Sequence, residues 1–182
     1  VQAQKTLSED QFFSSTKKYL ASFSGMVFNS YCVNDERQQI KEKLSDEETF
    51  FIKDTGDWFY NKNVYKGEKQ VSNNGFADLL KESIFSLCPS GTGPNSIRLW
   101  ESMNLGSIPV FFKSRQELVK INSCKWSDSC IFIEDYGSID QLPKFLKSLH
   151  PKNILERQEA LFITSKELTS LKNENLIEHY LV

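Results

Sequence analysis

The chain has 182 residues and a formal net charge of −2; 39% of its residues are hydrophobic and 25% are charged. This length allows one domain with a sizeable core, and the composition is that of an ordinary globular protein. The sequence has no basic stripe, which disfavours a nucleic-acid binder, and no apolar run near the roughly 18 residues that a membrane span requires.

The first residues, VQAQKTLSED, lack the charged start and the apolar stretch of a secretory signal. We therefore expect a soluble chain without a signal or transmembrane segment, located in the cytoplasm. The chain begins with Val rather than Met, which fits a part of a longer protein. In that case the Golgi lumen is the alternative location.

Helical and extended patterns alternate through the first half of the chain. Ser8 and Gln11 are spaced as a capping box, and Gly25 ends a strand in which apolar and polar residues alternate. Asn34 or Asp35 can cap the second helix. The predicted elements are a helix over 6–16, a strand over 18–24, a helix over 34–44, a strand over 49–53 and a helix from 73 or 74 to about 82.

The stretch 54–67 is polar with interleaved aromatic side chains. Such rings can stack on a sugar or a base, or they can cover the edge of a sheet, and we favour the second interpretation. The rings belong to Trp58, Phe59, Tyr60 and Tyr65.

The centre of the chain predicts a strand, a loop, a helix and a second strand. Residues 84–88 and 108–112 are apolar runs typical of buried parallel strands. The loop 89–95 holds two glycines and two prolines, and Ser96 is placed to cap the helix with its hydroxyl. The helix ends just before Gly106, which stands where a C-terminal glycine belongs. Such strands form a right-handed βαβ unit, whose ligands bind at the carboxyl ends of the strands, where this loop lies.

The loop and the start of the following helix suit an anion. Gly91 and Gly93 let a ligand approach the backbone, and the helix N-terminus offers N–H groups and a partial positive charge. Arg98 can bind phosphate through two hydrogen bonds, and the carboxylate of Glu101 can accept from two sugar hydroxyls. Alternatively, Arg98 and Glu101 pair on an exposed helix face. A kinase-type phosphate loop is disfavoured, because no Gly-Lys-Ser/Thr follows the glycines.

Strands and helices also alternate in the last third of the chain. Ser138 and Gln141 are spaced as a capping box, and Pro151 suits the first turn of a last helix. The chain is therefore predicted to be α/β, with a mostly parallel sheet and helices on both faces. The predicted elements are a short helix over 114–118, a loop over 122–129 that carries Trp126, a strand over 130–134, a helix over 138–149, a helix from 151 to about 166 and an interrupted helical pattern up to 181.

The four cysteines form no Cys-x-x-Cys pair, and the chain has only two histidines. We therefore predict no metal site. Cys88 ends an apolar strand and is expected to be a small core residue. Cys124 and Cys130 could form a disulfide in an oxidising compartment, but we favour thiols for both, and Cys32 is the fourth cysteine.

The run CPSGTGPNSIRLWESMNLGSIPVFF, from Cys88 to Phe112, resembles the signature of exostosin-type glycosyltransferases. That signature has a Pro–Gly loop, a Ser-x-Arg-x-x-Glu helix and a Gly-x-Ile-Pro-Val strand. Ser90 departs from it, because the family often has a basic residue there. Looser similarity extends over about residues 18–150. The matching residues are Pro89, Gly91, Gly93, Ser96, Arg98, Glu101, Gly106, Ile108, Pro109 and Val110.

The resemblance implies a Rossmann-like fold, the C-terminal, nucleotide-sugar-binding half of a two-domain GT-B transferase. We expect a single domain over 1–182, with its core at about 18–150 and a C-terminal helical segment over 151–182. In the family a Phe-x-Gly strand opens this half, so the loop 24–31 is either its first ligand-binding loop or an ordinary strand exit.

Two further features have counterparts in the family. Arg37 corresponds to a family arginine, although an arginine exposed on its helix is the commoner case. Glu134 and Asp135 occupy an acidic loop that precedes a helix, as in the closing part of exostosin-type domains.

The implied function is transfer of a sugar, with inversion, from a nucleoside diphosphate sugar to a glycan acceptor in polysaccharide biosynthesis. No metal or other cofactor is expected. Because no catalytic base is recognisable and such enzymes are usually longer, we expect a second domain or subunit to supply one, and the chain alone to transfer no sugar. The alternatives are a non-catalytic nucleotide- or sugar-binding module, one subunit of a two-chain transferase, or an unrelated α/β protein such as a nucleotide-binding regulator. The substrate-binding candidates are Gly25, Ser90, Gly91, Thr92, Gly93, Ser96, Arg98 and Glu101.

Overall fold

A parallel five-stranded sheet forms the centre of the molecule, with the strand order β2-β1-β3-β4-β5. The predicted α/β class is therefore confirmed, and each strand begins and ends within one residue of its predicted bounds. The strands are β1 (Tyr19–Gly25), β2 (Phe50–Asp54), β3 (Ser83–Cys88), β4 (Ile108–Phe112) and β5 (Ile131–Ile133). The computed structural model describes residues 7–14, 16–27, 35–56, 73–91, 96–112, 118, 122–123, 125–133 and 136–173.

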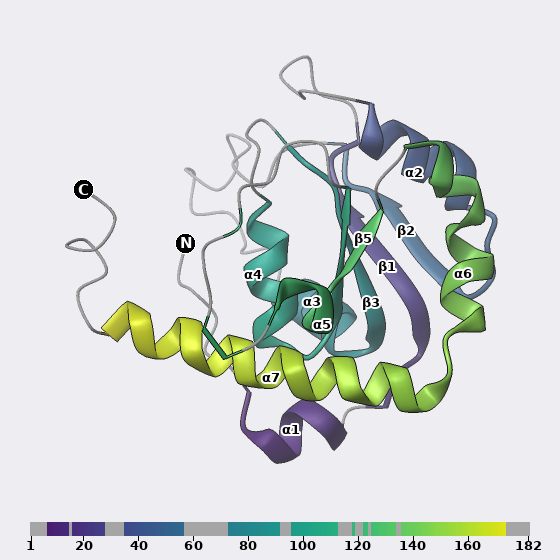
Figure 1. Cartoon of the computed structure of the whole chain (residues 1–182). Helices are drawn as coiled ribbons and strands as arrows, with labels where there is room; N and C mark the ends of the chain where they lie inside the picture. The colour runs from purple at the N-terminus through teal and green to yellow at the C-terminus, as the bar shows by residue number, and fades with distance from the viewer. Residues whose placement is uncertain are drawn as a thin grey trace, which may run out of the picture.

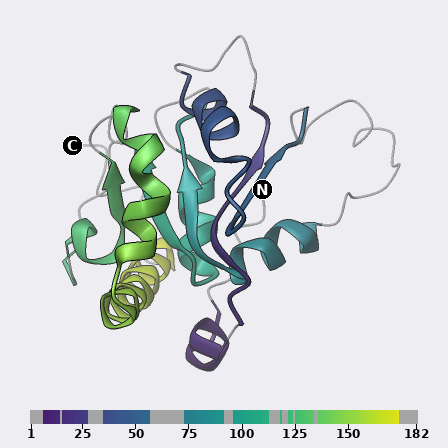
Figure 2. The same cartoon turned by 90° about the vertical axis from the view of Figure 1, so that its right-hand side faces the viewer.

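Helices lie on both sides of the sheet (Figure 1). Helices α3 (Asn73–Lys81) and α4 (Ile97–Asn104) lie on one side, and α2 (Glu36–Leu44) and α6 (Leu142–Ser148) lie on the other. The long helix α7 (Pro151–Asn173) crosses the molecule at the amino ends of the strands, and α1 (Glu9–Ser14) lies beneath it, as the side view in Figure 2 also shows. The carboxyl ends of the strands point away from α7. No described helix is long and apolar enough to span a bilayer.

The core is built from large apolar side chains at helical and strand spacing. β4 is buried along its whole length and β3 along almost all of its length, as expected for central parallel strands covered on both faces. Leu99 and Met103 on α4 are four residues apart and lie on one helix face, and Ile40 and Leu44 on α2 have the same spacing. Burying each such side chain contributes about 1.5–3 kcal/mol to stability.

Two predicted helix ends are confirmed by local geometry. The backbone N–H of Ser8 donates to Gln11 Oε1, and the backbone N–H of Gln11 donates to Ser8 Oγ, both at 3.4 Å, so the capping box of α1 is present. Gly106 follows α4 with a φ of +76°, a conformation that favours glycine. A Cβ there would also lie 3.0 Å from the carbonyl oxygen of Phe12, so the turn has little room for a side chain.

The predicted helix over 138–149 is wrong in its first turn. Tyr136–Gln141 form a 3₁₀ helix, η2, and α6 begins only at Leu142, so Ser138 and Gln141 do not form its capping box. Pro143 explains the difference. Proline has no backbone N–H. In a helix that started at 138, the carbonyl of residue 139 would therefore lack its donor at Pro143, whereas the first turn of α6 needs no such bond.

The end of the chain departs from prediction in three places. A short helix, α5 (Trp126–Ser129), replaces part of the predicted loop, and the Asp128 carboxylate accepts the backbone N–H of Lys125 at its start. Leu118 is not helical, and the rest of the helix predicted over 114–118 lies outside the described residues. Helix α7 begins at Pro151 as predicted but extends to Asn173.

Two of the cysteines can be placed. Cys88 and Cys130 are both buried and carry thiols, as expected for Cys88 and favoured for Cys130. Burial raises the pKa of the Cys88 thiol to about 11, so it stays protonated and unreactive at neutral pH. Cys32 and Cys124 lie outside the described residues, as do the aromatic side chains between 58 and 65 and the acidic pair Glu134 and Asp135.

Lys17 gives a testable stability prediction at the amino edge of the sheet. Its ammonium donates to the carbonyl oxygens of Lys81, at the end of α3, and Gly106, beyond α4, at 2.8 and 3.1 Å. Burial lowers the pKa of Lys17 to about 8. Between about pH 8 and the ordinary value of 10.5, the unfolded chain holds a proton that the folded chain has lost, so Lys17 makes stability rise with pH in this window.

Replacing Lys17 by Met should therefore lower the slope of unfolding free energy against pH between pH 8 and 10, measured from denaturant midpoints. The matched control is Lys53→Met, which removes an exposed lysine of β2 and should leave the slope as in the wild type. Equal slopes for Lys17→Met and the wild type would contradict the prediction.

Candidate functional site

The candidate site lies where β1 and β3 end. The chain passes from β1 to β2 on one side and returns to β3 on the other, so β1 and β3 are the neighbours at which the strand order reverses. In open parallel sheets the crevice at such a switch point, outside the carboxyl ends of the strands, is the usual ligand site. Gly25 ends β1 there, and Ser90 and Gly91 follow β3. The described part of the predicted loop therefore lies at the expected edge.

Arg98, in the first turn of α4, is the principal cation at this edge. Its Nη2 donates to the carbonyl oxygen of Ser24, and its guanidinium carbon lies 4.6 Å from the ring centroid of Phe23 and 5.8 Å from that of Phe76. Its Nε is buried and has no hydrogen-bond partner among the described residues. Burial lowers the pKa of Arg98 to about 10, so the side chain stays cationic at neutral pH. Arg98 is therefore a partly desolvated cation, and its buried Nε–H has no acceptor among the described residues.

Two of the glycines lie beside guanidinium groups. A Cβ on Gly25 would lie 2.6 Å from Arg98 Nη2, and a Cβ on Gly91 would lie 2.9 Å from Arg37 Nη2. Both distances are shorter than van der Waals contact. The two predicted glycines that the structure describes thus leave the space that the arginines occupy; Thr92 and Gly93 lie outside the described residues.

Arg37 is a member of the site that the candidate set omitted. It is half-buried on α2 rather than exposed, and its Nε donates to the carbonyl oxygen of Ser90 at 2.9 Å. Its Nη1 donates to the carbonyl oxygen of Met26, just after β1, also at 2.9 Å. The residue therefore connects the loops that follow β1 and β3. The sequence signal that could have identified Arg37 was the arginine that the exostosin family has at the corresponding position.

Ser90 faces the protein and not the solvent. It is buried, and both its backbone N–H and its hydroxyl donate to Oε2 of Glu36, at 2.6 and 2.8 Å. Glu36 begins α2 and is fully buried. Nothing in the sequence pattern singled out Glu36, because an acidic residue in the first turn of a helix is ordinary.

Ser96 stands at the N-cap of α4, as predicted, but its capping role is different. Within the described residues its side chain makes no capping hydrogen bond, so the predicted hydroxyl cap is wrong. The carbonyl oxygen of Ser96 accepts the backbone N–H of Leu99 at 3.1 Å instead. The Ser96 hydroxyl therefore does not accept a hydrogen bond from the described first turn of α4.

Glu101 lies one turn after Arg98 and is half-buried. Burial raises the pKa of its carboxyl, while the charge of Arg98 acts in the opposite direction. In the part of the chain that the structure describes, the two side chains form no ion pair, and neither is exposed. The alternative of a pair on a solvated helix face is therefore wrong.

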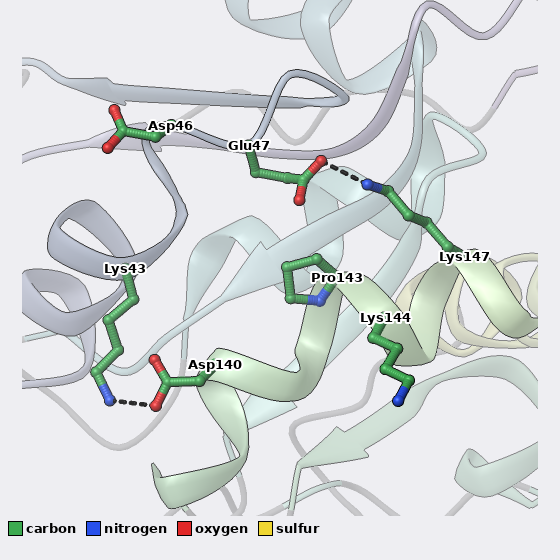
Figure 3. A pocket seen from close by; sticks show the side chains of 7 residues that line it. All are labelled: Lys43, Asp46, Glu47, Asp140, Pro143, Lys144 and Lys147. Carbon is green, nitrogen blue, oxygen red and sulfur yellow. Dashed lines mark hydrogen bonds and ion pairs between the residues drawn. The ribbon is translucent and has the colours of Figure 1, made fainter.

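A separate hollow of about 550 Å³ lies between the end of α2 and α6 (Figure 3). It shares no residue with the predicted site. Lys43 pairs with Asp140 at 2.9 Å and Lys147 with Glu47 at 2.7 Å, so its charges largely cancel. We therefore do not assign it as an anion site. Its lining residues are Lys43, Asp46, Glu47, Asp140, Pro143, Lys144 and Lys147.

The carboxyl edge thus presents two half-buried arginines, a half-buried carboxylate and a helix N-terminus. Groups of these kinds can interact with an anion by charge and hydrogen bonds, and with hydroxyls through the carboxylate. Among the described residues, no group of three histidine, cysteine, aspartate or glutamate side chains is arranged to hold a metal ion.

Comparison with known proteins identifies the family of the chain. The Exostosin GT47 domain matches residues 4–149. Exostosin-1b of Danio rerio is 24% identical over 162 residues, which cover 86% of this chain and 22% of that protein. The probable beta-1,4-xylosyltransferase IRX10L of Arabidopsis thaliana is 33% identical over 82 residues, covering 45% and 20%. The probable glucuronosyltransferase GUT1 of Oryza sativa subsp. japonica is 30% identical over 92 residues, covering 50% and 22%.

The chain spans about a fifth of the length of these relatives. The family match, by contrast, covers most of the chain, including the whole sheet and the candidate site. The chain therefore belongs to the exostosin GT47 family of glycosyltransferases.

Proposed function

We propose that this chain is the donor-binding domain of an inverting glycosyltransferase, which holds a nucleoside diphosphate sugar at the β1–β3 switch point while a glycan acceptor attacks. The acceptor and the base that deprotonates it belong to a second domain or subunit. The observation that carries the proposal is the partly desolvated guanidinium of Arg98, with its unpartnered Nε, at the edge where such folds bind ligands.

The electrostatics of Arg98 favour an anion. Its described contacts are a neutral carbonyl and two aromatic rings, so no carboxylate balances the guanidinium at close range. A buried charge is costly unless it is paired, and a diphosphate would supply the missing partner. The N-terminus of α4, one residue away, adds partial positive charge in the same place.

The same charges suit the reaction. In an inverting transfer the diphosphate leaves as negative charge develops on its oxygens, and fixed cations stabilise that charge. Glu101, one turn further along α4, would accept from two adjacent hydroxyls of the ribose or the sugar. The names of two relatives point to xylose or glucuronic acid as donor sugars to be tried first.

Arg98→Ala tests the phosphate contact. It should weaken the binding of a nucleoside diphosphate and of its sugar conjugate alike, by about tenfold to a hundredfold, because charge-assisted hydrogen bonds contribute about 1.5–3 kcal/mol each. Calorimetric titration at neutral pH measures both affinities. A melting curve shows whether the variant is folded.

The matched control is Arg157→Ala. Arg157 on α7 also donates to backbone carbonyls, those of Ser127 and Cys130 at 2.6 and 2.8 Å, but it lies away from the candidate site. This variant should lose stability and keep its affinity. A folded Arg98→Ala protein that binds as tightly as the wild type would refute the phosphate site.

Glu101 gives a pH-dependent test. Only the ionised carboxylate accepts from two hydroxyls, and burial raises the pKa of Glu101 despite the opposing charge of Arg98. Affinity for the nucleotide sugar should therefore fall on acidification at a higher pH than an ordinary glutamate would cause. Glu101→Gln should bind more weakly at neutral pH and lack this component of the pH profile.

The comparison is made by titrating the wild type and Glu101→Gln at several pH values, with Glu156→Gln, an exposed change on α7, as control. Because the ligand titrates equally in all three experiments, only the difference between proteins is used. Identical profiles for the wild type and Glu101→Gln would remove Glu101 from the site.

A further inference from the structure

We propose that Glu36 is a positioning residue, which holds Ser90 and thereby keeps Ser90 and Gly91, just after β3, in the position that the ligand requires. This inference rests on the proposed function and concerns how its site is held. It assigns Ser90 a role through Glu36 and not as a direct ligand of the phosphate.

The contacts converge on one residue. A single carboxylate oxygen of Glu36 accepts both the backbone N–H and the hydroxyl of Ser90, at 2.6 and 2.8 Å. The next residue on α2, Arg37, donates to the carbonyl oxygen of Ser90 at 2.9 Å. Two consecutive residues of α2 therefore hydrogen-bond the backbone N–H, the carbonyl and the hydroxyl of Ser90. These contacts fix both the backbone and the side chain of Ser90.

The same helix turn also fixes the opposite wall of the crevice. Arg37 donates to Met26, which follows β1, so the loops after β1 and β3 are joined through α2. Glu36 and Ser90 are both buried, at 0% and 2% exposure, so water does not compete for these hydrogen bonds. The backbone of the next residue, Gly91, lies beside the same arginine, since a Cβ built on Gly91 would lie 2.9 Å from Arg37 Nη2.

The arrangement also determines which donors the ligand can use. Because Glu36 takes the N–H and the hydroxyl of Ser90, neither is directed to a phosphate. A carboxylate in this position is stabilised by charge-assisted hydrogen bonds and by the N-terminus of α2, where Glu36 is the first residue. The anion is then left to Arg98 and the start of α4, and Glu36 acts on the ligand only through the position of Ser90 and Gly91.

The experiment compares Glu36→Gln, Ser90→Ala and the double variant. Glu36→Gln keeps the size of the side chain but removes its charge, and Ser90→Ala removes one of the two bonds. We expect affinity for a nucleoside diphosphate to fall about tenfold in Glu36→Gln and about threefold in Ser90→Ala. The double variant should fall about tenfold and not thirtyfold, because both changes break one connection.

Amide hydrogen exchange of Ser90 provides a readout without any ligand. The N–H should exchange faster in Glu36→Gln than in the wild type, because its acceptor is weakened. The matched control is Glu42→Gln on the exposed side of α2, whose carboxylate accepts from Gln38 at 2.7 Å. It should change neither the affinity nor the exchange of Ser90.

The outcomes separate this inference from the function on which it rests. Wild-type affinity in folded Glu36→Gln and Ser90→Ala, while Arg98→Ala still loses binding, overturns the positioning role alone. Lower melting temperatures with unchanged affinity would mean that Glu36 only stabilises the fold, which overturns it as well. If Glu36→Gln does not fold, the affinity of Ser90→Ala for the nucleoside diphosphate decides. A folded Ser90→Ala protein that binds as tightly as the wild type then overturns the positioning role. No binding of diphosphate by the wild type overturns both the function and this inference.

Discussion

The enclosure of the Arg98 guanidinium constrains the rest of the carboxyl edge. The cation lies on the ring of Phe23 and donates to Ser24, and its Nη2 would lie 2.6 Å from a Cβ on Gly25. The last three residues of β1 are thus fixed by a residue of α4. Placing a charge there costs solvation that a carbonyl and two rings only partly restore. An anion bound at this site would therefore stabilise the guanidinium, and this is the physical basis of the proposed chemistry.

Helix α2 braces the same edge from the other side of the sheet. Its first turn holds Ser90 and Met26, and Lys41 further along pairs at 2.8 Å with Asp54 at the end of β2. Burial acts to raise the pKa of Asp54, but hydrogen bonds from Lys41, Gly56 and Val27 outweigh it and hold that pKa below its ordinary value. The loops after β1, β2 and β3 are thereby connected by polar contacts, so a ligand at one would meet a prearranged surface.

The two edges of the sheet differ in their contacts: the amino edge is closed by helix packing, and the carboxyl edge carries the candidate site. At the amino edge, α1 packs on α7 through the rings of Phe12 and Phe162, 5.1 Å apart, and Lys17 donates to the carbonyls at the end of α3 and just beyond α4. These contacts stabilise the fold, although the buried hydroxyl of Ser107, just before β4, has no hydrogen-bond partner among the described residues. At the carboxyl edge, charges are half-buried and one donor is unpartnered, as is typical of sites that bind.

The sequence by itself determined the sheet, because buried parallel strands are continuous apolar runs and helix ends carry glycine or proline; Gly106 and Pro151 are placed as predicted. It also indicated Arg98 and Glu101, whose spacing puts both on one helix face. It mistook the start of α6, where Pro143 overrides a capping pattern. Only the tertiary structure decided that Glu36 and Ser90, 54 residues apart, share a buried hydrogen bond, and that Arg98 rests on Phe23 and not on Glu101. The reason is physical: local patterns fix which backbone segments form, whereas the partner of a buried charge depends on which segments the sheet brings together.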